Sequence, residues 1–87
     1  MQELSAGAKK MLWHLHKNGF RQQVYEVPAK LIELFDDPED CENAEAELEA
    51  LNLIALGPLP HFAAPHRVKA AALTLDGIRF IDRGGLG

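Results

Sequence analysis

The chain has 87 residues, of which 47% are hydrophobic and 25% charged, and its formal net charge is −4. This length suits one small domain with a single modest core. The lone cysteine, Cys41, excludes a disulfide within the chain and any zinc site built on two or four thiolates.

The distribution of charge is more informative than its total. Residues 1–32 hold five cationic and two acidic side chains, and residues 54–87 hold four and two. Residues 33–53 hold nine acidic side chains and no Lys or Arg. One block therefore carries all the excess negative charge. Neither a leader peptide nor an apolar run of about 20 residues is evident, so a cytoplasmic protein without a membrane segment is expected.

Residues 5–18 are predicted to form the first helix. Ser5 is a good N-cap, and Asn18-Gly19 is a typical helix end. Apolar residues recur at helical spacing, and Trp13 and Phe20 are expected to complete the buried side. The expected stripe consists of Leu4, Ala8, Met11, Leu12 and Leu15.

A short strand and two further helices are predicted next. Residues 22–27 are rich in β-forming side chains, and Pro28 then favours the first position of a helix over 28–35. Asp37 can cap a third helix over 38–52, with Pro38 at its first position. The expected buried stripe of this helix is Cys41, Ala44, Leu48 and Leu51.

The C-terminal part is predicted to be a β-hairpin. Its strands are expected over 53–56 and 68–75. Residues 59–66 between them contain two prolines and are expected to form a loop. Asp76-Gly77 is expected to end the second strand, and 78–81 to add a helical turn or a short strand. Residues 1–83 then form one domain, and 84–87 a flexible Gly-rich tail.

This order of elements resembles the winged-helix (winged helix-turn-helix) superfamily, in particular its small bacterial or phage-type domains. The resemblance covers about residues 4–82. Residues 47–54 look like a third helix that runs into the first wing strand, and 73–81 contain the phrase Leu-Thr-x-x-Gly that often closes the wing. The resemblance implies an α+β fold with a three-helix core, a short strand and a C-terminal β-hairpin wing. The alternative is an unrelated three-helix α+β domain with a terminal hairpin.

In that superfamily the third helix commonly enters the DNA major groove, and the wing contacts phosphates. Here the third helix has six carboxylates and no Lys or Arg, which argues against contact with phosphates. With about 100° per residue, Glu39, Asn43, Ala46 and Ala50 are expected to point outward. The flanking rows are Glu42, Glu45 and Glu49 on one side, and Asp40 and Glu47 on the other.

The expected function is therefore a non-enzymatic module for protein interaction or self-association, as a homodimer. Phe62, at the centre of an apolar wing loop, either completes the core or is an exposed anchor for the partner. The expected partner-binding residues are Glu42, Glu45, Ala46, Glu49, His61 and Phe62. The alternative is a small DNA-binding transcription regulator that uses Lys9, Lys10, Arg67 and Lys69.

Metal binding and catalysis are not expected. His14 and His16 point in nearly opposite directions on a helix, and His61 and His66 have no evident third ligand. Cys41 falls on the buried stripe, where a free cysteine acts as a small apolar filler. The carboxylates lie on a convex helix face, whereas acid–base catalysis needs a concave site. We expect no cofactor, no metal and no small-molecule substrate.

Overall fold

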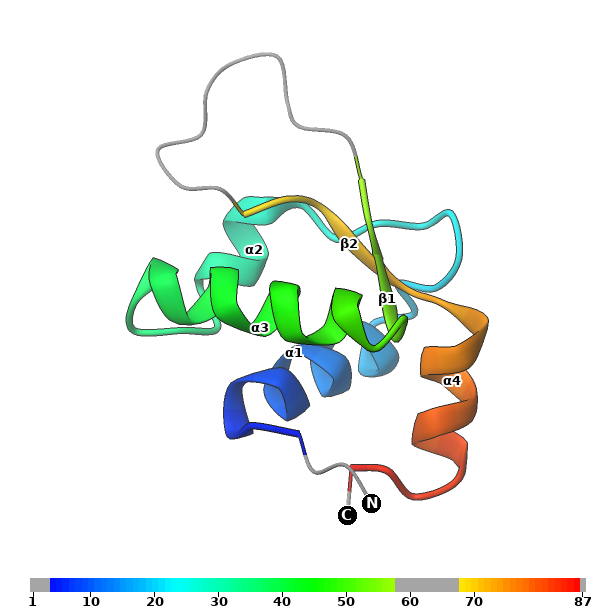
Figure 1. Cartoon of the computed structure of the whole chain (residues 1–87). Coiled ribbons are helices and arrows are strands. Elements are labelled where there is room, and N and C mark those ends of the chain that lie inside the picture. Colours follow the sequence, from blue (N-terminus) through cyan, green and yellow to red (C-terminus); the bar gives the residue numbers. More distant parts are fainter. Residues whose placement is uncertain (1–3, 58–67, 87) are drawn as a thin grey trace.

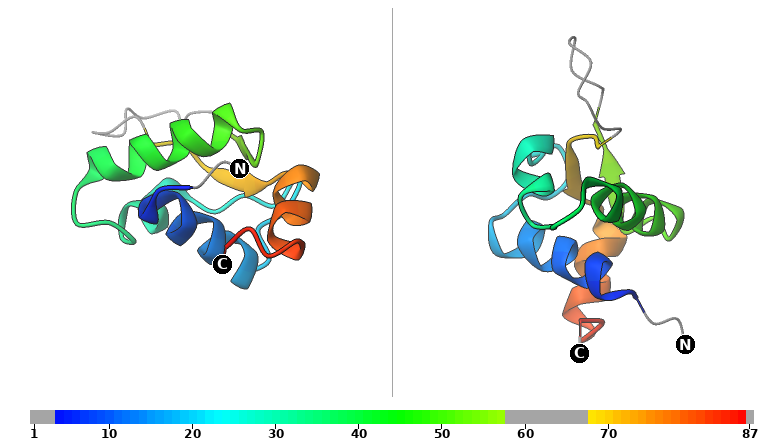
Figure 2. Two further views of the ribbon diagram at one scale, coloured as in Figure 1. Left: turned by 60° about the horizontal axis from the view of Figure 1, so that its bottom comes forward. Right: turned by 90° about the vertical axis from the view of Figure 1, so that its left-hand side faces the viewer.

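The computed structural model describes residues 4–57 and 68–86 and has an α+β fold (Figure 1). Within these residues, four helices accompany one two-stranded antiparallel sheet. Helix α3 packs on α1, and α4 packs beside β2. Figure 2 shows α2 and α3 on opposite sides of the base of the hairpin. The elements are α1 (Ala6–Lys17), α2 (Pro28–Ile32), α3 (Pro38–Ala50), β1 (Ile54–Leu56), β2 (Ala71–Leu73) and α4 (Leu75–Asp82).

Helix α1 confirms the predicted cap and the predicted stripe, but not the predicted burial of Trp13. The Ser5 hydroxyl accepts a hydrogen bond from the Ala8 N–H at 3.2 Å. All five predicted stripe residues are buried in the core, and Phe20 is partly buried against it. The prediction for Trp13 was wrong: this side chain is 54% exposed. Trp13 therefore lies on the outer side of the helix, away from the buried stripe.

The strand predicted over 22–27 is present only as two isolated bridges to β2. Arg21 pairs with Leu73, and Glu26 pairs with Ala71. Between them the chain leaves the extended conformation, since Gln22 has a φ of 59°. Hydrogen bonds to the sheet are therefore made at the two ends of this segment, and Val24 between them is exposed.

Helices α2 and α3 follow the predicted starts more closely than the predicted ends. Pro28 and Pro38 begin them, and Asp37 Oδ1 accepts the Glu39 N–H at 2.9 Å. Helix α2 stops at Ile32, before the predicted end at residue 35. In α3 the predicted core residues Cys41, Ala44 and Leu48 are buried, whereas Leu51 is partly buried.

The hairpin is shorter than predicted, and a fourth helix follows it. Ile54 pairs with Leu73, Ala55 with Ala72 and Leu56 with Ala71. The second strand ends at Leu73, before the break predicted at 76–77, and α4 includes 78–81, for which a helical turn was one of the two predicted alternatives. Asp76 and Gly77 lie in the first turn of this helix. The Thr74 hydroxyl caps α4 by accepting the Gly77 N–H at 3.0 Å, and it donates to the Asn52 carbonyl at 2.6 Å.

The end of the chain continues into turns after α4. Gly84 N–H donates to the Ile81 carbonyl, and Gly85 N–H donates to the Phe80 carbonyl. Leu86 is partly buried against the core. The predicted wing loop, with His61, Phe62 and His66, and the adjoining Arg67 lie outside the described residues. Across the described ranges, no helix is long and apolar enough to cross a membrane.

Candidate functional site

A cleft of about 350 Å³ lies between α3 and the base of the hairpin. We call it the α3 cleft. Successive turns of α3 supply the acidic wall. The hairpin supplies the opposite wall, with Leu56 from β1 and Lys69, which precedes β2. The lining residues of the cleft are Glu42, Asn43, Glu45, Ala46, Glu49, Leu56 and Lys69. The structure thus brings together four of the predicted partner-binding residues, Glu42, Glu45, Ala46 and Glu49.

Glu45 was expected in a row that flanks the outward strip of α3 and to be available to a partner, but this residue is only 3% exposed. Its Oε1 accepts a hydrogen bond from the backbone N–H of Lys69 at 3.0 Å. Its Oε2 is also buried, but has no hydrogen-bond partner among the described residues. Position 45 follows Cys41 by four residues and precedes Leu48 by three, which places it next to the apolar stripe. That spacing was the signal in the sequence that its assignment to an accessible flanking row overlooked.

Burial is the main electrostatic influence on this carboxyl group. Desolvation raises the pKa of Glu45 to about 7, and the neighbouring Glu49 and Glu42 carboxylates act in the same direction. The hydrogen bond from the Lys69 N–H and the Lys69 charge oppose this shift in pKa. Glu45 therefore exchanges a proton near neutral pH inside the α3 cleft.

The other acidic residues of α3 do not form two equivalent rows. Glu47 is engaged with the start of α1: its Oε1 accepts the Ser5 hydroxyl at 2.7 Å, and its Oε2 accepts the Ser5 N–H at 2.9 Å. Glu39, Asp40 and Glu49 are exposed to solvent, and Glu42 is partly buried. The surface of α3 thus remains acidic, although two of its six carboxylates have structural positions.

Of the cations proposed for DNA contact, the structure describes Lys9, Lys10 and Lys69, and they have different surroundings. Lys10 Nζ donates to the Leu34 carbonyl at 3.0 Å and lies 5.3 Å from the centre of the Phe35 ring. Lys9 is a partly buried residue of α1, and Lys69 lines the acidic α3 cleft. Lys10 and Lys69 therefore make contacts within the protein, and nothing in their positions indicates that they bind the same DNA backbone.

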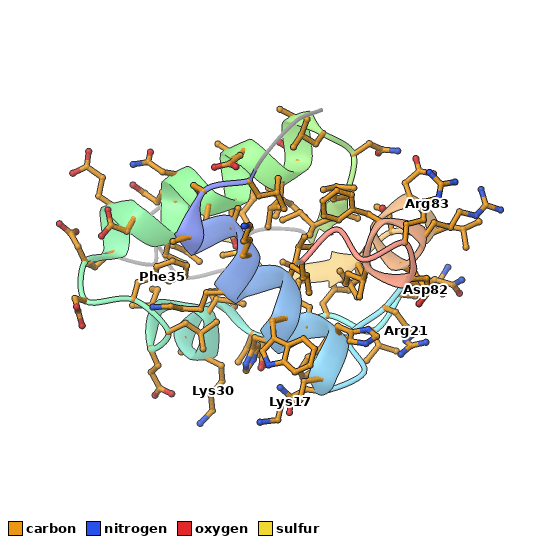
Figure 3. The ribbon with its side chains drawn as sticks, turned by 90° about the horizontal axis from the view of Figure 1, so that it is seen from below. Lys17, Arg21, Lys30, Phe35, Asp82 and Arg83 are labelled. Atoms are coloured by element: carbon orange, nitrogen blue, oxygen red, sulfur yellow. The ribbon has the colours of Figure 1, made fainter. Side chains whose placement is uncertain are left out.

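Other cations gather on the side of the molecule away from α3. Figure 3 shows Lys17 and Lys30 apart from each other along the edge opposite α3, with Arg21 on the side of Lys17, toward Asp82. All three side chains are exposed. Lys30 pairs with Glu33 at 3.8 Å (i,i+3), and this pair neutralises part of the edge. We call Lys17, Arg21 and Lys30 the basic edge, which sequence reasoning missed because the three residues come from three different segments.

The histidines of α1 have separate surroundings. His14 Nε2 lies 2.7 Å from Glu26 Oε2, and its ring stacks on Phe20 with the ring centres 6.2 Å apart. His16 lies beside Trp13. In the part of the chain that the structure describes, no three His, Cys, Asp or Glu side chains are grouped so that they could hold a metal ion.

A second hollow, of about 430 Å³, lies between the start of α1 and one side of α3, with Phe35 and Asp36 also lining it. Its walls include Ser5, Glu47, Lys10 and Phe35, which already contact one another in pairs. The α3 cleft differs because it contains a buried carboxylate oxygen that lacks a hydrogen-bond donor within the described structure. The α3 cleft is therefore the better candidate site.

Comparisons of the chain with protein-family models, with curated proteins and with solved structures find no match.

Proposed function

We propose that this chain is a non-enzymatic, cytoplasmic interaction module on a winged-helix frame, and that it binds a basic segment of a partner protein. The binding surface consists of the exposed carboxylates of α3 and the α3 cleft beside them. The observation that carries the proposal is that Glu39, Asp40 and Glu49 are exposed on a helix without any Lys or Arg.

Support for the winged-helix frame comes from the order of the elements. A helix is followed by a segment that bridges to the sheet, then by two helices and an antiparallel hairpin. The bridges of Arg21 and Glu26 to β2 stand where the resemblance implies a short third strand. On this frame α3 takes the place of the helix that enters DNA in other members.

The chemistry of α3 favours a cationic protein over DNA. Phosphate binding gains free energy when Lys and Arg displace counterions, and carboxylates at the same place oppose it. A basic peptide meets complementary charge on α3, and such complementarity accelerates association. The carboxylates, amide and alkyl groups of the α3 cleft suit recognition of a cation, with no nucleophile–base pair built around a substrate.

The test is a pair of titrations of the isotope-labelled chain, followed by amide resonances. One ligand is a 12-residue peptide of alternating lysine and alanine, and the other is a random DNA duplex. We expect the peptide to shift resonances of α3 and of residues around Lys69, and the duplex to shift none. A double variant, Glu39→Gln with Glu49→Gln, should weaken peptide binding, since it removes two of the three exposed carboxylates.

The contrary result is micromolar binding of the duplex at low salt, which weakens steeply at about 0.2 M. That result would make the chain a DNA-binding regulator that docks through its cations. Shifts at α3 that grow with protein concentration alone would instead mean that the basic edge of a second copy is the partner.

A further inference from the structure

We propose that the α3 cleft is a lysine-binding site, in which Oε2 of Glu45 accepts a hydrogen bond from the ammonium group of one partner lysine. The proposal rests on the proposed function and identifies the residue type that the basic partner must insert. It starts from an incomplete set of hydrogen bonds. Glu45 Oε1 accepts a hydrogen bond from the Lys69 N–H, while Oε2 is buried without a donor among the described residues.

A buried carboxylate oxygen without a donor is uncommon in folded proteins, because desolvation of such an oxygen is costly unless a hydrogen bond replaces the lost water. The cost is recovered if a ligand brings the missing donor. Glu45 lines the open α3 cleft while its Oε2 is covered, so a donor that enters the cleft reaches this oxygen when the side chain turns outward. The unsatisfied oxygen and the cleft together indicate a ligand that carries a hydrogen-bond donor.

The free oxygen also indicates which cation fits. Arginine binds carboxylates best through two parallel hydrogen bonds to both oxygens. Here one oxygen of Glu45 is already occupied by the Lys69 N–H, so the paired geometry is not available. A lysine ammonium donates each hydrogen bond independently and needs only one oxygen. The site therefore favours lysine over arginine.

The remaining walls suit the rest of a lysine side chain. Ala46 and Leu56 present alkyl groups, against which the methylene stem of a lysine can pack. Glu42 and Glu49 stand on the same wall as Glu45 and add negative potential. Lys69, on the hairpin side, is a cation that lines the cleft and opposes the ligand charge. Among the described lining residues, carboxylates outnumber cations.

The first experiment uses the whole chain and tetralysine, acetylated at one end and amidated at the other, in a titration followed by amide resonances. We expect the amides of Glu45, Ala46, Leu56 and Lys69 to shift. Tetraarginine should bind more weakly, and tetralysine acetylated on its side chains should not bind. Glu45→Gln should weaken tetralysine binding by about 10- to 100-fold, because it replaces a charged acceptor by an amide.

Glu39→Gln is the matched control, since it removes one charge from an exposed position of α3 outside the cleft. We expect it to weaken binding less than about threefold, in line with an exposed pair. Equal effects of Glu45→Gln and Glu39→Gln would overturn the lysine site while leaving the broader proposal of an acidic docking surface intact. Absence of any shift on α3 with every basic peptide would overturn both.

A second readout does not depend on how a variant folds. The carboxyl carbon resonance of Glu45 in the unaltered chain gives the pKa of this group with and without tetralysine. Insertion of the ammonium group should lower the pKa of Glu45 by at least one unit from about 7, since the cation stabilises the charged form. An unchanged pKa at saturating tetralysine would show that the peptide stays on the surface and would overturn the inference.

Discussion

At the residue scale, Glu45 is a polar residue in an apolar position. It stands at helical spacing from Cys41 and Leu48, and its neighbours along the cleft are alkyl groups and other carboxylates. The sequence contains this spacing, but the depth of burial depends on the hairpin that covers the side of α3. The hydrogen bond from the Lys69 N–H spans 24 positions in sequence, so no local pattern could predict it.

The buried carboxyl group makes stability depend on pH near neutrality. Burial raises the pKa of Glu45 from 4.5 to about 7, so the folded chain holds a proton that the unfolded chain releases. The stabilisation is complete below pH 4.5 and is lost as the pH rises through 7. We expect the free energy of unfolding to fall between about pH 5 and 8 by up to about 3 kcal/mol.

Urea denaturation at several pH values measures this change, and Glu45→Gln is the reference. The glutamine carbonyl can still accept the Lys69 N–H, but the side chain carries no ionisable group. We expect the variant to show a smaller loss of stability with rising pH and to be the more stable form at pH 8. Parallel pH profiles of the two chains would contradict the assignment.

Trp13 illustrates a second limit at this scale. Its neighbours Met11 and Leu12 are fully buried, but the helix turns by about 100° per residue and carries Trp13 away from them. A large aromatic side chain was expected inside because of its hydrophobicity alone. Periodicity is the stronger indicator in this helix, since it assigns all five stripe residues correctly.

At the scale of elements, helices α1 and α3 are joined through Ser5 and Glu47. The Ser5 hydroxyl accepts the Ala8 N–H and donates to Glu47, so one group both caps α1 and contacts α3. We expect Ser5→Ala to lower the free energy of unfolding by about 1–2 kcal/mol. In a double-mutant cycle with Glu47→Ala, the coupling should be about 0.5–1 kcal/mol, measured by urea denaturation. Simple additivity would mean that the capping bond alone stabilises α1.

Helix α4 depends on the glycine in its first turn. Gly77 is buried, and a Cβ at this position would overlap the Leu53 carbonyl oxygen. We expect Gly77→Ala to destabilise the fold by about 2 kcal/mol or more, because α4 must move away from the hairpin. Leu75→Ala, at a 51% exposed position of the same helix, is the control and should change the melting temperature little. Equal melting temperatures for the two variants would contradict this close approach.

The same glycine explains why the fourth helix was not predicted in full. An Asp-Gly pair after a strand usually indicates a turn, and here it was interpreted as one. The glycine is instead needed for close contact with Leu53, and Asp76 accepts a hydrogen bond from Asn52 at 2.8 Å. Whether an Asp-Gly pair forms a turn or begins a helix here depends on Asn52 and Leu53, which are more than 20 positions away.

At the scale of the whole molecule, charge is divided between α3 and the basic edge. The order of the helices and the hairpin could be predicted, because caps, prolines and periodicity are local signals. The basic edge could not, since Lys17, Arg21 and Lys30 are brought together only by packing of their segments. The sequence identified the acidic α3 and four residues of its cleft, but missed Asn43, Leu56 and Lys69 as walls.

Repulsion among the carboxylates of α3 should make the fold more stable in salt. Glu39 and Glu42 are three residues apart, and a like-charged pair at such helical spacing destabilises a helix by about 0.2–0.5 kcal/mol. We expect the melting temperature to rise by about 2–5 °C between 0.02 and 0.5 M sodium chloride, since salt screens exposed charges. The variant with Glu39→Gln and Glu49→Gln should show a smaller rise. A melting temperature that falls with salt would mean that attraction across the molecule dominates.

Because Cys41 is buried, its alkylation can report how often the core opens transiently. Burial raises the pKa of the Cys41 thiol to about 12, with Glu45 and Glu42 acting in the same direction, so the closed chain offers almost no reactive thiolate. An alkylating reagent can modify this side chain only in molecules whose core is transiently exposed. The modification rate under native conditions, divided by the rate for the unfolded chain, therefore gives the fraction of time the core spends open, without any denaturant.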